Sequence, residues 1–178
     1  MTEFLSEAAL LRLKERVRDL RLRLSILQKS VCGINTENID DIIRQKLPND
    51  VKREAVELLS RIKAAELFLS SFGAVAYPAS SAVTRQYGST GALLNLLFRL
   101  GMGNEYGYLF VTSHRGRISA RHSLYPYVEL WGGRFKPEVL LAVDINEHAF
   151  YLDYGFDKRA YLYAALPYLD LARLDRGE

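Results

Sequence analysis

The sequence predicts an α+β fold: an N-terminal helical hairpin, then an antiparallel meander of about five strands and a C-terminal helix. Three observations support this. Apolar residues recur with heptad spacing up to residue 73, the apolar period changes to two from residue 106, and residues 157–175 are again helical in pattern. The 178 residues are 49% hydrophobic and 25% charged, which excludes disordered, collagen-like and disulfide-scaffold chains.

Two heptad-patterned segments predict the helical hairpin. The first helix covers residues 3–31, and the second begins at Asn49 or Asp50 and closes at Gly73. A short connecting helix, capped by Thr36 and ended by Pro48, joins them. The two apolar seams must pack on each other, on the rest of the chain or on a second copy, so we expect a homodimer. The seams are formed by Leu10, Leu13, Val17, Leu20, Leu24, Leu27 and Val31, and by Val51, Ala55, Leu58, Ile62, Ala65, Leu69 and Phe72.

The second part of the chain is predicted to be a sheet domain, which divides the protein into an arm (1–73) and an α+β domain (74–178). Residues 73–91 read as a linker, and residues 89–100 as a short buried helix. The turn Arg115-Gly116 places Phe110 opposite Arg121 and Thr112 opposite Ser119. The C-terminal helix is broken or kinked by Pro167. The predicted strands cover residues 106–113, 118–123, 127–131, 139–145 and 148–154.

Charge is distributed unevenly behind a net value of +3. Residues 12–29 carry a net charge of +5 and residues 112–136 carry +4, whereas residues 137–178 carry −4. Two basic segments beside an acidic one indicate an acidic partner, or a contact between the two halves of the chain.

The single cysteine, Cys32, excludes an internal disulfide and fits a reducing compartment. The N-terminus has acidic residues where a signal peptide would have basic ones, and no stretch is apolar enough to be an integral membrane segment. We therefore expect a cytoplasmic protein.

The sequence favours a non-enzymatic binding or regulatory module that self-associates and contacts an acidic partner. Nucleic acid is the favoured partner. Arginines on the first helix would contact phosphates, and arginines and aromatic rings on the first β-hairpin would position and stack bases if that sheet face is open. A covered face, with the rings in the core, and a solvated basic helix are the structural alternatives. The candidate nucleic-acid-binding residues are Arg12, Arg16, Arg23, Tyr108, Phe110, Arg115, Arg117 and Arg121.

Two other functions stay open. A small metal-independent ribonuclease could use the 114–129 region, with Glu129, His122 or His114, and Arg121 in acid–base and charge-stabilising roles. A protein–protein adaptor would use the basic segments on an acidic protein surface. The spacing of these groups is not diagnostic, so we assign no catalytic residue. The histidines and the cysteine show no ligand spacing, and we predict no metal site and no cofactor.

Overall fold

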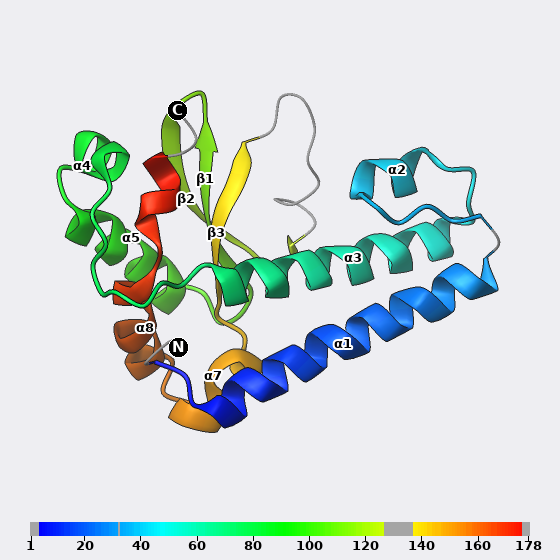
Figure 1. The fold of residues 1–178 in the computed structure, drawn as a ribbon, viewed down its shortest axis with the longest axis horizontal. Coiled ribbons are helices and arrows are strands. Elements are labelled where there is room, and N and C mark those ends of the chain that lie inside the picture. The colour runs from blue at the N-terminus through cyan, green and yellow to red at the C-terminus, as the bar shows by residue number, and fades with distance from the viewer. Residues whose placement is uncertain (1–3, 32, 127–136, 176–178) are drawn as a thin grey trace.

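The computed structural model describes residues 4–31, 33–126 and 137–175, and it confirms an α+β fold that begins with helices. A three-stranded sheet follows the N-terminal helices, and shorter helices close the chain (Figure 1). The elements are α1 (Glu7–Ser30), α2 (Ile39–Arg44), α3 (Asn49–Ser70), α4 (Ser81–Tyr87), α5 (Thr90–Met102), β1 (Tyr108–His114), β2 (Arg117–Ser123), β3 (Glu138–Asp144), α7 (Glu147–Tyr154), α8 (Lys158–Ala165) and the 3-10 turns Leu166–Tyr168 and Leu171–Asp175.

Helices α1 and α3 form a long antiparallel pair, and α2 lies beside its far end (Figure 1). Ser6 caps α1 by accepting a hydrogen bond from the Ala9 amide. The predicted seams pack on each other within one chain: Leu20 and Leu24 of α1 share a buried cluster with Leu58 and Ile62 of α3. The heptad spacing is therefore explained by the hairpin itself and no longer supports a dimer.

The sheet has three strands among the described residues, in the order β2-β1-β3, so the prediction of a meander of about five strands is wrong. The predicted register is confirmed: Phe110 lies opposite Arg121, and Thr112 opposite Ser119. Strand β1 lies in the centre because β3 pairs with it and not with β2. The predicted strand at 127–131 lies outside the described residues.

Residues 148–154 belong to helix α7 and not to the predicted fifth strand. Asn146 occupies the N-cap position of α7, and Glu147 lies in its first turn, where a negative charge is favourable. A helix start signal therefore overrode the short alternation of apolar and polar residues that suggested a strand.

In the predicted linker, Ser80 caps the unpredicted helix α4, and Asn38 replaces Thr36 as the cap of α2. The predicted break at Pro167 is confirmed, because α8 ends at Ala165 and a 3-10 turn follows.

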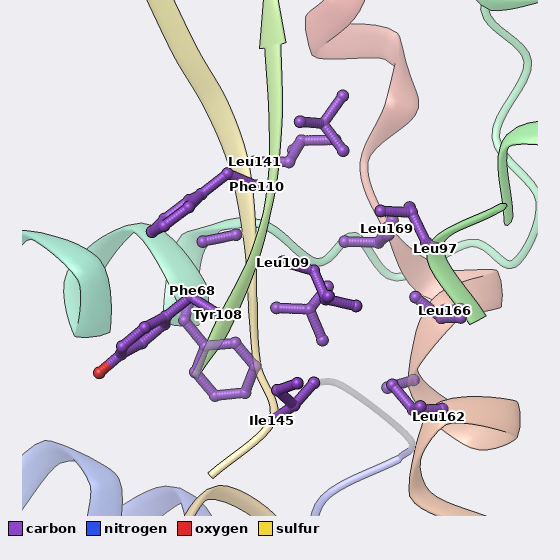
Figure 2. Close-up of a cluster of buried hydrophobic side chains, with 14 of the residues drawn as sticks. Phe68, Leu97, Tyr108, Leu109, Phe110, Leu141, Ile145, Leu162, Leu166 and Leu169 are labelled. Carbon is purple, nitrogen blue, oxygen red and sulfur yellow. The ribbon is translucent and has the colours of Figure 1, made fainter. Parts of the chain in front are cut away.

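The main buried cluster joins both parts of the chain. It combines Leu13 of α1 and Phe68 of α3 with the central strand β1 and with Leu162 of α8. Figure 2 shows this cluster, in which Leu97 of α5 and the C-terminal residues Leu162, Leu166 and Leu169 lie together on one side of β1. The division into an arm and a sheet domain at residue 73 stays a prediction, and the arm contributes side chains to the core of the sheet.

Both edges of the sheet are covered by side chains that hydrogen-bond to the backbone. Gln86 of α4 accepts from the Ile118 amide at 2.7 Å and donates to the Ile118 carbonyl, which occupies the outer edge of β2. The Ser71 hydroxyl accepts from the Ala142 amide of β3 at 2.8 Å. These contacts satisfy backbone groups that would otherwise be open to pairing with another chain.

Within the described ranges, no helix has both the length and the apolar composition that crossing a bilayer requires.

We predict that Asp175 stabilises the fold in a pH-dependent way. Its carboxylate accepts hydrogen bonds from the Ala82 amide at 2.9 Å and from the Ser80 hydroxyl at 3.0 Å. The hydrogen bond from the Ala82 backbone, more than those from Ser80 and Ser81, lowers the pKa of Asp175 below its usual value. A lowered folded-state pKa stabilises the fold above the unfolded-state pKa, and this contribution is lost as the pH falls through the folded-state pKa.

Thermal unfolding at several pH values checks this prediction. Asp175→Ala should cost about 1 kcal/mol at neutral pH, and the difference from the wild type should shrink as the solution is acidified below about pH 4. Glu54→Ala, which removes an exposed carboxylate from α3, is the control and should change little. A pH-independent loss in Asp175→Ala would show that the ionised carboxylate is not the stabilising form.

Candidate functional site

Asp144 is a buried carboxylate at the end of β3, where only 2% of the residue is exposed. Its Oδ1 atom accepts hydrogen bonds from the Asn146 backbone amide at 2.9 Å and from Asn146 Nδ2 at 2.6 Å. Its Oδ2 atom lies 2.9 Å from Nε2 of His148. A buried charge is tolerated only when it is paired and hydrogen-bonded, and here both carboxylate oxygens have polar partners.

The change from β3 to α7 brings these side chains together. Asp144 ends the strand and His148 lies in the first turns of the helix, so the chain must reverse sharply between them. Asn146 holds this corner by hydrogen bonds in both directions with the backbone of Gly107. Gly107 has a φ of +115°, and a Cβ atom there would lie 2.6 Å from the Ser123 carbonyl oxygen, so glycine is required.

A pocket of about 220 Å³ opens between this corner and the helical pair. Arg16 of α1 and Arg61 of α3 line it together with Tyr108, Asn146 and His148. A second cleft of about 540 Å³ runs along α1, and Arg16 and His148 line this cleft too. Arg16 and His148 therefore lie where the two cavities meet.

The two arginines that line the pocket differ in whether they have an ion-pair partner. Arg61 forms an ion pair with Glu57 at 2.6 Å. Arg16 is half-buried, and no carboxylate within the described ranges forms an ion pair with it. The buried charge of Asp144 and the partly buried charge of Arg16 thus belong to one site, where the local dielectric is lower than in water.

Tyr108 supplies a neutral hydroxyl to the pocket. Its ring is buried, and Figure 2 shows the hydroxyl oxygen pointing out of the hydrophobic cluster. Burial raises the pKa of Tyr108 well above its usual value, and the charge of Asp144 raises it further, while Arg16 and Arg61 act in the opposite direction. The hydroxyl therefore stays protonated at neutral pH and can donate a hydrogen bond.

The C-terminal part of the chain, which carries Asp144 and His148, matches a known family. Residues 77–176, more than half of the chain, match the family model of the iron/manganese superoxide dismutases, C-terminal domain. The chain belongs to this family. Helices α1 and α3 precede the matched residues. No curated protein matches the sequence.

Membership of the superoxide dismutase family corrects the predicted function. Nucleic-acid binding by a non-enzymatic regulatory module is contradicted, because the family match indicates chemistry on superoxide at a metal and not recognition of a polynucleotide. The ribonuclease and adaptor alternatives fall with it. The family also implies iron or manganese, which the sequence did not suggest.

The side chains of the site do not fit a complete iron or manganese centre. Asp144 and His148 are suitable ligand types, and their separation of 2.9 Å suits two neighbouring ligands of one ion as well as a hydrogen bond. Stable transition-metal sites need at least three protein donors. Nowhere in residues 4–31, 33–126 and 137–175 do three His, Cys, Asp or Glu side chains gather closely enough to hold a metal ion. Arg16 and Arg61 line the space instead, and the charge of Arg16, which has no ion-pair partner among the described residues, repels a divalent cation.

The eight residues predicted to bind nucleic acid do not form one surface. Arg12 is exposed and pairs with Glu15 at 3.6 Å, Arg23 is exposed further along α1, and Arg115 lies in the β1–β2 turn. Arg16 belongs to the pocket described above, while Arg117 and Arg121 line a separate cavity on β2.

The predicted stacking face is closed. Tyr108 is 6% exposed and Phe110 is fully buried, and their rings stack on each other with centroids 5.7 Å apart. Neither ring can receive a base, because the sheet face that carries them packs against the core. The sequence analysis left this alternative open.

Sequence reasoning missed Asp144 and His148, although a signal for them was present. Asp144 ends an apolar strand pattern, and His148 follows four positions later, directly after the helix start signal Asn146-Glu147. The assignment of residues 148–154 to a strand hid this signal, because it placed His148 in a second strand and not in a helix that begins beside Asp144. Glu129 lies outside the described residues. His122 contacts the Tyr106 carbonyl through its Nε2 atom at 2.8 Å and does not line the pocket.

Proposed function

We propose that the pocket beside Asp144 and His148 binds a small inorganic anion of the charge and size of superoxide, without a metal ion held by this chain. The observation that carries this proposal is the position of Arg16, which lines both cavities next to His148 and has no ion-pair partner within the described ranges. Half-buried guanidinium groups bind anions well, because they donate several hydrogen bonds and stay charged.

The other groups of the pocket favour the same ligand. Tyr108 offers a hydroxyl that stays protonated. Arg61 on the facing helix also lines the pocket, but its charge is balanced by Glu57, so the attraction for an anion comes from Arg16. The Asp144 carboxylate is satisfied by Asn146 and His148, which leaves Arg16 free to attract an incoming anion. The open cleft along α1 supplies a route to the pocket.

Metal-dependent superoxide dismutation is the second candidate function. The family match and the 2.9 Å separation of the Asp144 and His148 ligand atoms favour it. It requires at least one more donor than the described residues supply. The two candidates differ in whether the purified protein contains iron or manganese.

We predict that the chain holds neither metal. Protein expressed with added iron and manganese salts should contain far less than one metal ion per chain by elemental analysis, because two donors give weak binding. It should show no dismutase activity above a metal-free control. One iron or manganese per chain, with activity that Asp144→Asn abolishes, would establish the dismutase function and overturn the metal-free site.

We predict that nitrite, a stable anion similar in charge and size to superoxide, binds beside His148. The chain has three histidines, so ring signals in heteronuclear NMR spectra can be assigned by single substitutions. Nitrite should move the His148 ring signals in a saturable way and leave those of His114 and His122 in place. Arg16→Gln should weaken this binding roughly tenfold, the effect of losing one charge-assisted hydrogen bond.

Arg23→Gln is the matched control for the nitrite experiment, since it removes the same charge from the same helix at an exposed position outside both cavities. It should leave the affinity unchanged. If Arg23→Gln and Arg16→Gln weaken nitrite binding equally, or if all three histidines respond alike, nitrite is attracted by the overall positive charge of α1. That result would show that the pocket is not a binding site.

We also propose that the protein forms a homodimer in the cytoplasm. The heptad seams no longer support this, but exposed apolar side chains on and after α7 do: Tyr151, Leu152 and Phe156, the last with 76% of its area exposed. Such a cluster is typical of surfaces that associate. Light scattering should give twice the chain mass, and Leu152→Asp should give the monomer mass; a wild-type monomer would contradict the dimer.

A further inference from the structure

A second cavity lies on the β1–β2 hairpin, away from Asp144. Its volume is about 320 Å³, and it is lined by His114, Arg117, Ser119, Arg121 and Pro137. None of these residues lines the pocket or the cleft beside His148. This cavity is therefore separate from the pocket and the cleft beside His148.

The register of the hairpin gathers its basic side chains on one face. Arg117, Ser119 and Arg121 alternate along β2, so their side chains leave the strand on the same side. His114 of β1 lies opposite Arg117 and extends this row across the hairpin. The neighbouring positions on β2 turn the other way: Ile118 is buried in the core, and His122 is bound to the Tyr106 carbonyl.

Among the residues that the structure describes, no acidic side chain lines the cavity. Among the described ion pairs, none involves His114, Arg117 or Arg121. Two permanent positive charges are held on one strand face, while Arg12, Arg21, Arg61 and Arg173 all have carboxylate partners. Like charges at fixed spacing repel each other, and an anion placed between them removes that repulsion.

The spacing of the two arginines defines the ligand. Their Cα atoms are separated by four residues of strand, roughly 13 Å at 3.3 Å per residue. Two guanidinium groups that lean inward from that distance can each take one end of a doubly charged group, with the Ser119 hydroxyl between them as a further donor. A single phosphate would draw both guanidinium groups and their like charges to one point, whereas two linked phosphates let each guanidinium keep a phosphate of its own.

We infer that the β2 cavity is a binding site for a small molecule that carries a diphosphate group. Arg117 and Arg121 each bind one phosphate, Ser119 donates to an oxygen between them, and His114 adds a donor at the open end. Gln86 of α4 hydrogen-bonds to both backbone groups of Ile118, so the strand that carries the two arginines is tied to α4 along its outer edge.

Isothermal titration of the full chain with inorganic pyrophosphate and with orthophosphate tests this inference. Pyrophosphate should bind at least roughly tenfold more tightly than orthophosphate, because the second phosphate gains its own guanidinium. Arg117→Gln and Arg121→Gln should each reduce the pyrophosphate affinity roughly tenfold and bring it close to that of orthophosphate. Because Arg117 and Arg121 are both exposed, neither substitution should change the midpoint of thermal unfolding.

Arg115→Gln is the matched control, since it removes the same charge from the turn between the two strands without touching the cavity. It should change the pyrophosphate affinity by less than about twofold. Equal affinities for the two phosphates, or an equal loss in Arg115→Gln, would overturn the site and leave a general electrostatic attraction. Arg16→Gln should not affect pyrophosphate binding, so the outcome is separate from that of the nitrite experiment.

Discussion

The carboxylate of Asp144 is the constraint on which the rest of the site depends. It is almost fully buried at the end of β3, so each of its oxygens needs a partner and its charge needs a balancing one. Asn146 and His148 supply the partners, and Asn146 in turn fixes the backbone at Gly107. Satisfying this one buried charge explains three features: the corner from β3 into α7, the close approach of the strands at Gly107 and the orientation of His148.

The helical pair determines what this carboxylate faces. In a metalloenzyme the balancing charge would come from a metal ion, and donor side chains would be needed on the facing helices. Here α1 and α3 carry Arg16 and Arg61 at that place. A guanidinium group carries a positive charge but provides no lone pair for a metal, since arginine does not lose its proton in proteins. The unpaired charge of Arg16 at this place therefore makes the site attractive to anions and not to cations.

Features fixed by local sequence were predictable, and features fixed by tertiary contacts were not. The heptad spacing of Leu20 and Leu58 located both long helices, and the Arg115-Gly116 turn set the hairpin register to the residue. The burial of Tyr108 and Phe110 depended on which elements cover the sheet, which no strand pattern reveals. His148 was assigned to a strand because residues 148–154 alternate over too short a stretch to separate the two periods. Because the ligand pair spans that misassigned boundary, the error in secondary structure removed the site as well.

Anomalous diffraction from crystals grown with manganese chloride tests most directly whether arginine has replaced the metal. We expect no anomalous peak between Asp144 and His148, and we expect a guanidinium group or a bound anion in the space that Arg16 and Arg61 line. A peak bonded to both Asp144 and His148, with Arg16 turned away from the pocket, would contradict this expectation.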